Sequence, residues 1–121
     1  MRPRKSLPRK AARKASTTWL QGASWSFTGS MRQARTYFAA TLLNNGQVLV
    51  AGGTYRRTFV QYGLPSAELY NPSTGTFTNS ASLNTARQGH AAALLPNGQV
   101  LAIGGYESQN GTWLASAELY Q

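Results

Sequence analysis

The stretch NNGQVLVAGG at residues 44–53 returns almost unchanged as PNGQVLAIGG at residues 96–105. When the chain is shifted against itself by 52 residues, positions 34–53 fall on positions 86–105, and 13 of these 20 positions are identical. Such agreement does not arise by chance, so the chain is built from copies of one structural unit.

The repeated unit extends beyond this stretch on both sides. The motif SAELY occurs at residues 66–70 and again at residues 116–120, an offset of 50 rather than 52, which predicts a surface loop of variable length before it. The shift by 52 residues also places Trp25 on Phe77, so a partial copy precedes the two clear ones.

Each unit is predicted to form four short strands. Residues 37–43 and 47–52 are nearly continuous apolar runs joined by Asn-Gly, which predicts a tight hairpin with both strands buried on both faces. In SAELY, residues suited to the two faces of a sheet alternate, and residues 76–78 hold one aromatic between polar neighbours. Both patterns are typical of strands with one side in water. Burial is therefore expected to fall from the first strand to the fourth, as in a propeller blade whose inner strand lies near the axis.

The order of these motifs resembles the kelch repeat over nearly all of the chain after Thr18. The matching positions are the double glycines Gly52-Gly53 and Gly104-Gly105, the tyrosines Tyr70 and Tyr120, and the aromatics Trp25 and Phe77. The sequence of these repeats is similar to that of a bacterial kelch subgroup. Members of this subgroup are related to the central domain of galactose oxidase and are often exported. This resemblance implies an all-β fold of kelch-type β-propeller blades, each a four-stranded antiparallel sheet. Phe77 departs from the usual tryptophan, and Phe38 stands where the second unit has His90.

About two blades are expected. Residues 1–18 are predicted to be a basic disordered tail, followed by a lone fourth strand at 19–30, a complete blade at 31–80 and a three-stranded blade at 81–121. Two blades alone would expose apolar faces worth on the order of 10 kcal/mol, as much as the whole stability of a typical domain.

Two explanations of the blade number stay open, because propellers close with four to eight blades. The chain is either a piece of a longer propeller or a homo-oligomer, for example a trimer that closes six blades. In such a ring the strand around Trp25 would pair head-to-tail with residues 116–120 of the next subunit.

The positive charge is concentrated in the tail. The formal net charge is +9, but seven of the twelve Lys and Arg residues lie within residues 1–17. The tail is either a solvated arm or an attachment site for nucleic acid or another anionic surface, although no aromatic residue for base stacking precedes Trp19. No apolar run follows these charges and no stretch is long enough to span a membrane, so the compartment stays open.

Ligand binding is expected on the face that carries the long loops at residues 54–65 and 106–115, because these segments differ between the units. Exposed aromatics beside arginine make good binding anchors. The candidate residues are Tyr55, Arg56, Arg57, Tyr62, Glu107 and Trp113. The alternative is that the aromatic side chains only pack the loops against the sheet. The expected ligand is a protein or a carbohydrate.

Catalytic residues, cofactors and metals are not expected. A copper radical oxidase needs a cysteine cross-linked to a tyrosine and several histidines, whereas this chain has no cysteine and only His90. Glu68 and Glu118 are repeat equivalents, and each is expected to bind either backbone or an arginine of the neighbouring blade, with Arg35 and Arg87 as the obvious partners. His90 is expected to be hydrogen-bonded. The predicted function is a non-enzymatic binding or scaffold module; the alternative is a fragment of a larger secreted carbohydrate-active or oxidase-like propeller protein.

Overall fold

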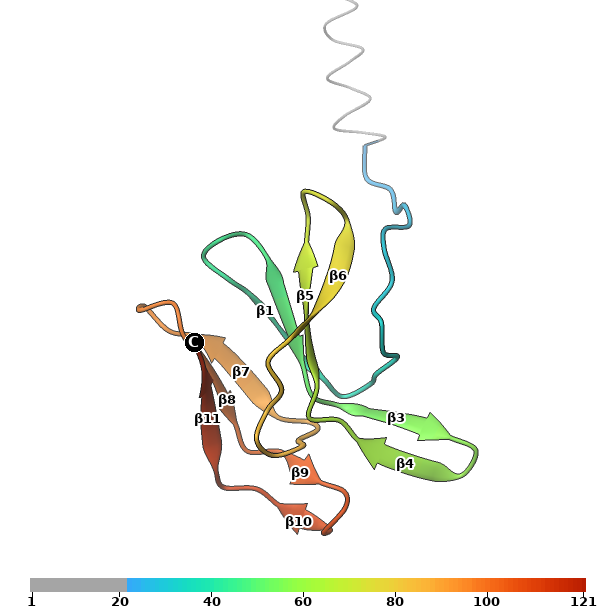
Figure 1. Ribbon diagram of the computed structural model, residues 1–121, viewed down its shortest axis with the longest axis vertical. Helices are drawn as coiled ribbons and strands as arrows, with labels where there is room; N and C mark the ends of the chain where they lie inside the picture. Colours follow the sequence, from blue (N-terminus) through green and yellow to red (C-terminus); the bar gives the residue numbers. More distant parts are fainter. Residues whose placement is uncertain (1–21) are drawn as a thin grey trace, which may run out of the picture.

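The computed structural model describes residues 22–121, and every regular element in that range is a β-strand (Figure 1). The strands pair in antiparallel sheets, which confirms the expected all-β class. Residues 1–21 lie outside the described part of the chain, and with them the expected tail at residues 1–18 and its attachment to an anionic surface.

Two sheets repeat one arrangement. The first sheet has four strands in the order β1 (Ala39–Leu42), β2 (Val48–Ala51), β5 (Ala67–Asn71) and β6 (Thr76–Ser80). The second sheet has three strands in the order β7 (Ala91–Leu94), β8 (Val100–Ile103) and β11 (Ala117–Tyr120). The repeat makes β7, β8 and β11 the equivalents of β1, β2 and β5, so each sequence unit forms one sheet.

The Asn-Gly turns form as predicted. Gly46 has a φ of 88°, and its N–H donates to the carbonyl of Leu43 at 3.0 Å. The Asn45 side-chain oxygen accepts the N–H of Gln47 at 2.9 Å, which fixes the return into β2. The second sheet repeats this turn, with Gly98 at a φ of 89°. The same local chemistry therefore sets the strand register in both sheets.

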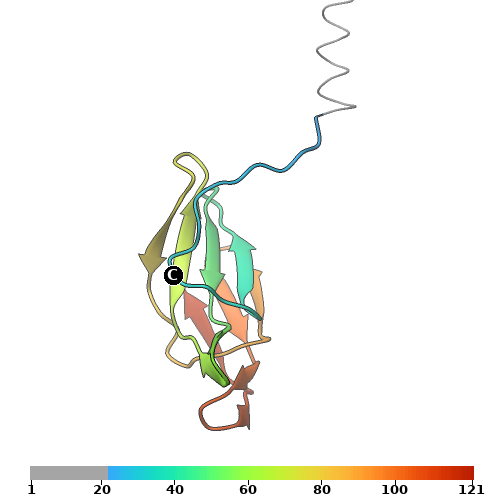
Figure 2. The ribbon, with the colours of Figure 1, turned by 90° about the vertical axis from the view of Figure 1, so that its right-hand side faces the viewer.

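The two sheets pack face to face, with the core between them (Figure 2). Leu49, Ala51 and Ala67 from the first sheet are buried with Val100 from the second. Small side chains let the two backbones approach closely. This packing holds the strand ends, and therefore the segments that leave them, in one fixed arrangement.

The expected decrease in burial from the first strand to the fourth is wrong. β2 is the most buried strand, while β1 and β7 alternate between exposed and half-buried residues. The reason is that β1 and β7 are edge strands, whereas β2 lies between β1 and β5, and Leu42 on β1 is 64% exposed.

The two long loops are in fact β-hairpins, which corrects the sequence analysis. The first hairpin pairs β3 (Thr54–Arg57) with β4 (Val60–Gly63), and the second pairs β9 (Tyr106–Glu107) with β10 (Thr112–Trp113). Both leave the same end of the sheets (Figure 1). Cross-strand aromatic pairs stabilise them: the Tyr55 and Tyr62 ring centroids are 5.1 Å apart, and those of Tyr106 and Trp113 are 4.6 Å apart.

No strand is assigned between residues 22 and 35, although the sequence predicts a lone fourth strand at residues 19–30. A strand needs a neighbour, and the neighbour expected for this one belongs either to the rest of a longer propeller or to another subunit. The lone fourth strand therefore stays a prediction.

The expected ion pairs between arginine and glutamate form, but each joins two residues of the same unit rather than of neighbouring blades. Arg35 Nη2 lies 3.1 Å from Glu68 Oε2, and Arg87 Nη2 lies 2.9 Å from Glu118 Oε2. Burial by itself raises the pKa of Glu68, but the N–H of Arg32 and the Arg35 guanidinium donate to its carboxylate and hold the pKa below its usual value. Each pair lies within one unit and anchors the segment that precedes the inner strand.

Candidate functional site

A surface depression of about 310 Å³ lies between the two hairpins. It is lined by Tyr37, Gln61, Gln88, Gly89, Gly105, Tyr106 and Trp113. We call it the aromatic depression. Both units contribute to its wall, so the depression exists only because the two sheets pack as they do.

Backbone and amide hydrogen bonds fix the wall of the aromatic depression. Gln88 and Tyr106 exchange two backbone hydrogen bonds of 3.0 and 2.9 Å. The side-chain amide of Gln61 donates to Gln88 Oε1 at 3.2 Å and to Thr54 Oγ1 at 3.0 Å. These bonds join the first hairpin to the second unit and hold the two hairpins at a set separation.

Glycine lets the chain turn from each sheet into its hairpin. Gly105 has a φ of 97°, and a Cβ at this position would lie 2.7 Å from the carbonyl oxygen of Gln88. Gly53 has a φ of 92°, and a Cβ there would collide with the carbonyl oxygen of Thr36. The glycine pairs found in the sequence therefore serve to aim the hairpins.

Tyr37 is the unusual residue of the aromatic depression. Its φ is 56°, in the left-handed region that a tyrosine rarely adopts, and its side chain is 69% exposed. The equivalent residue of the second unit is Gly89, with a φ of 63°. Tyrosine in this conformation is strained by about 1 kcal/mol, and an exposed ring recovers little of that through packing. A strained and exposed side chain of this kind makes Tyr37 a candidate for ligand contact.

Of the predicted ligand residues, Trp113 lines the aromatic depression and the others lie outside its lining. Trp113 is 81% exposed. Tyr55 and Tyr62 stack on each other across the first hairpin, and Glu107 accepts a hydrogen bond of 3.0 Å from the side-chain amide of Asn110. Their role in binding stays a prediction.

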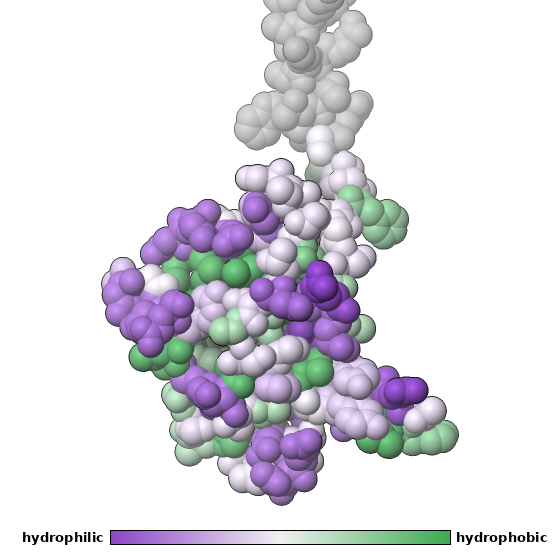
Figure 3. All heavy atoms as spheres, viewed as in Figure 1, coloured by the Kyte–Doolittle hydropathy of each residue, from purple (hydrophilic) through white to green (hydrophobic). Residues whose placement is uncertain are grey.

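The first hairpin carries the other two predicted residues. Arg56 and Arg57 are exposed and form no salt bridge within the described part of the chain. Phe59 at the hairpin turn is 98% exposed, and Figure 3 shows apolar and hydrophilic side chains next to each other at this tip. The tip therefore offers charge and apolar surface to a partner.

Sequence reasoning missed four side chains of the aromatic depression: Tyr37, Gln61, Gln88 and Tyr106. One signal was available for Tyr37, because the repeat aligns it with a glycine. Nothing in the sequence indicated Gln61 or Gln88, because their positions depend on the hairpins, whose sequences differ between the two units.

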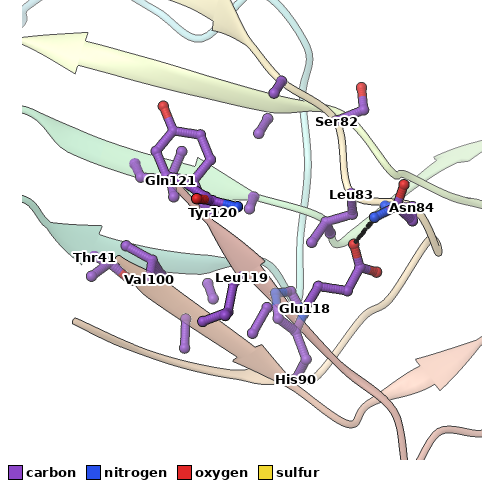
Figure 4. Close-up of a pocket in the computed structure, with 17 residues that line it drawn as sticks. Thr41, Ser82, Leu83, Asn84, His90, Val100, Glu118, Leu119, Tyr120 and Gln121 are labelled. Carbon is purple, nitrogen blue, oxygen red and sulfur yellow. Dashed lines mark hydrogen bonds between the residues drawn. The ribbon is translucent and has the colours of Figure 1, made fainter. Parts of the chain in front are cut away.

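A second cavity, of about 290 Å³, lies between the two sheets (Figure 4). We call it the inter-sheet cavity. His90 and Glu118 lie toward one end, and Tyr120 and Gln121 lie toward the other. The walls between them are mostly alanine, valine and leucine.

His90 differs from its expected role. Its ring is buried, and neither ring nitrogen has a hydrogen-bond partner among the described residues, so the expected hydrogen bond is absent. Burial lowers the pKa of His90, and the positive charge of Arg87 lowers it further against a smaller opposing effect of Glu118. The imidazole is therefore neutral at neutral pH.

Residues 22–121 contain no cluster of three or more side chains that could hold a metal ion. Within the same range no helix is long and apolar enough to cross a membrane.

Comparison with known proteins places these observations in a family. No family model matches the chain. It is 36% identical over 84 residues to Kelch-like protein 15 of Danio rerio, and equally to the proteins of that name from Mus musculus and Homo sapiens. The match covers 67% of this chain but only 14% of those relatives. A solved structure of YjhT superposes with a TM-score of 0.61 at 18% identity, over 69% of this chain and 25% of that one, which shows a shared propeller fold.

Proposed function

Because the chain belongs to the kelch-repeat family, we propose that it is a non-enzymatic binding module whose partner docks on the face formed by its two hairpins. The relatives support a kelch-type binding or scaffold role in general. The specific face is inferred from the residues that the two units do not share.

Tyr37 is the observation that carries the proposal. A strained, exposed aromatic lies where the second unit uses glycine, and it lines the aromatic depression together with Tyr106 and Trp113. Rigid rings lose little conformational entropy when they bind, which makes them effective anchors.

The chemistry of the face favours a protein segment as the ligand. The aromatic depression would take an apolar side chain, the amides of Gln61 and Gln88 would bond its backbone, and Arg56 and Arg57 would pair with acidic groups beside it. A carbohydrate is the second candidate, because aromatic faces next to amide groups also suit a sugar ring and its hydroxyl groups.

A single substitution separates binding from folding. Tyr37→Gly relieves the backbone strain, so the free energy of unfolding is expected to stay the same or rise by up to about 1 kcal/mol. Ligand affinity is expected to fall at least about tenfold, as for an aromatic anchor. The ligands are peptides selected from a random display library against the full chain, with an oligosaccharide array in parallel, and affinities are measured by isothermal titration.

Trp113→Ala is expected to weaken the binding of the same ligands, whereas Ser73→Ala, at an exposed position in the β5–β6 turn at the other end of the sheets, serves as the control. If selected peptides and glycans bind the Tyr37→Gly variant as well as the original chain, the hairpin face is not the binding surface. Selection of glycans alone would favour the carbohydrate candidate.

A further inference from the structure

Asparagine followed by glycine occurs three times in the chain, as Asn45-Gly46, Asn97-Gly98 and Asn110-Gly111. This pair is chemically labile, because the backbone nitrogen that follows asparagine can attack the side-chain amide, and glycine has no side chain to block the approach. All three asparagines are exposed, so access to water does not distinguish them. The hydrogen bonds around each pair do distinguish them.

The first pair is held by the turn that it forms. The N–H of Gly46 donates to the carbonyl of Leu43 at 3.0 Å. The Asn45 side chain is held twice, since its Oδ1 accepts the N–H of Gln47 at 2.9 Å and its Nδ2 donates to Gln47 Oε1 at 3.0 Å. Neither the attacking nitrogen nor the amide carbon can therefore move without breaking hydrogen bonds.

The turn of the second sheet protects its own pair in the same way. The N–H of Gly98 donates to the carbonyl of Leu95 at 2.9 Å. The Asn97 side chain accepts the N–H of Gln99 at 3.0 Å and donates to Gln99 Oε1 at 2.8 Å. In each of these two turns, three hydrogen bonds restrain the groups that would have to react.

The third pair lies in the loop between β9 and β10, where the backbone nitrogen is not engaged. Within residues 22–121, the N–H of Gly111 donates to no backbone carbonyl. The loop between β5 and β6 has the same length, and there the N–H of Gly75 donates to the carbonyl of Asn71 at 2.7 Å. The nitrogen that would attack is therefore protected in one loop and available in the other.

The side chain of Asn110 is also held more loosely than those of the other two asparagines. Its Nδ2 donates to Glu107 Oε1 at 3.0 Å, whereas its Oδ1 accepts no hydrogen bond from the part of the chain that the structure describes. The amide group can therefore turn toward the nitrogen of Gly111 with the loss of a single exposed hydrogen bond.

We propose that Asn110 is a site of spontaneous deamidation, and that the fold protects Asn45 and Asn97 from the same reaction. The Gly111 nitrogen loses its proton to solvent, and its electron pair forms a bond to Asn110 Cγ. The bond between Cγ and Nδ2 breaks, and ammonia leaves with a proton from solvent, so a succinimide ring remains. Water then opens this ring to aspartate or isoaspartate. The net reaction consumes one water and releases one ammonia, without oxidation or reduction.

The product changes the second hairpin. A carboxylate at position 110 cannot donate to Glu107, so two negative charges face each other in the loop. In the isoaspartyl form a methylene also enters the backbone of the loop. Deamidation is therefore expected to weaken the pairing of β9 with β10, which holds Tyr106 and Trp113 in the wall of the aromatic depression.

Peptide mapping by mass spectrometry tests the proposal on the full chain. The chain is incubated in mildly alkaline buffer, and the rate of deamidation is measured at each asparagine, while circular dichroism checks that it stays folded. Asn110 is expected to react at least about tenfold faster than Asn45 or Asn97, because the turns at these two positions must first open several hydrogen bonds.

The same incubation in concentrated urea is the matched control, since unfolding removes the turns and leaves the three Asn-Gly sequences unchanged. The three rates are expected to agree within about threefold there, because residual structure in an unfolded chain has small effects. Asn110→Gln is expected to abolish the fast reaction, because the longer side chain would have to close a less favourable ring. Equal rates in the folded chain, a faster reaction at Asn110 that persists in urea, or a fast reaction that survives Asn110→Gln would each overturn the proposal.

Discussion

His90 is buried without a hydrogen-bond partner in the described chain, at a position where the first unit has Phe38. Burial lowers its pKa from the ordinary value of 6.5, with a further contribution from Arg87. The unfolded chain therefore binds a proton near pH 6.5 that the folded chain does not bind. Stability is expected to fall as the pH drops below 6.5 and toward the folded-state pKa.

His90→Phe tests this account. The substitution removes the titrating ring and places a side chain that the first unit already uses into the inter-sheet cavity. We expect the free energy of unfolding to rise by about 1 kcal/mol at mildly acidic pH, because a buried unsatisfied polar group is removed. Urea unfolding at about pH 7.5 and about pH 5.5 measures it.

His90→Ala is the matched control, since it also removes the titration but enlarges the cavity and is expected to be less stable than the original chain. If His90→Phe keeps the full pH dependence of the original chain in this range, another group is responsible.

At the scale of the element, each hairpin depends on the glycine pair that precedes it. A Cβ at Gly53 would collide with the carbonyl oxygen of Thr36, whereas a Cβ at Gly46 would meet nothing within 4 Å, although both residues have a positive φ. The two positions therefore separate backbone strain from steric exclusion.

Gly46→Ala is expected to destabilise the fold by about 1 kcal/mol through strain alone. Gly53→Ala is expected to destabilise it by clearly more, and to weaken ligand binding because the first hairpin moves. Thermal unfolding and titration with a selected ligand measure the two effects. Equal destabilisation by the two substitutions would contradict the steric account.

The sequence predicted the sheets well, because nearly the same β-hairpin sequence occurs at residues 44–53 and 96–105 and each copy supports the assignment of the other. It missed the projecting hairpins, because residues 54–65 have no copy and their strands are too short for a clear alternation. The aromatic depression was missed for a related reason: Gln61 and Gln88 meet across two units, and a contact of that kind depends on how the sheets pack.

At the scale of the whole molecule, the apolar side chains of Ile103 and Leu119 are exposed on the outer face of the second sheet. A contact that forms only between folded copies stabilises the folded state by mass action. The thermal midpoint of the chain is therefore expected to rise with protein concentration.

Differential scanning fluorimetry over a hundredfold dilution series measures this effect. Leu119→Ser, which removes apolar surface from the outer face of the second sheet, is expected to have a midpoint that no longer depends on concentration, whereas Trp113→Ala is expected to retain the dependence. A midpoint of the original chain that is constant over the series would contradict self-association through folded copies.

Tyr37 also bears on protein engineering. Consensus design gives every repeat the same sequence in order to gain stability. For these two units it must choose between tyrosine and glycine at the position of Tyr37 and Gly89. Choosing glycine would relieve the left-handed strain and make the chain more stable. It would also delete the side chain that we assign to the ligand, so an engineer who optimises this repeat for stability alone would select for a module that no longer binds.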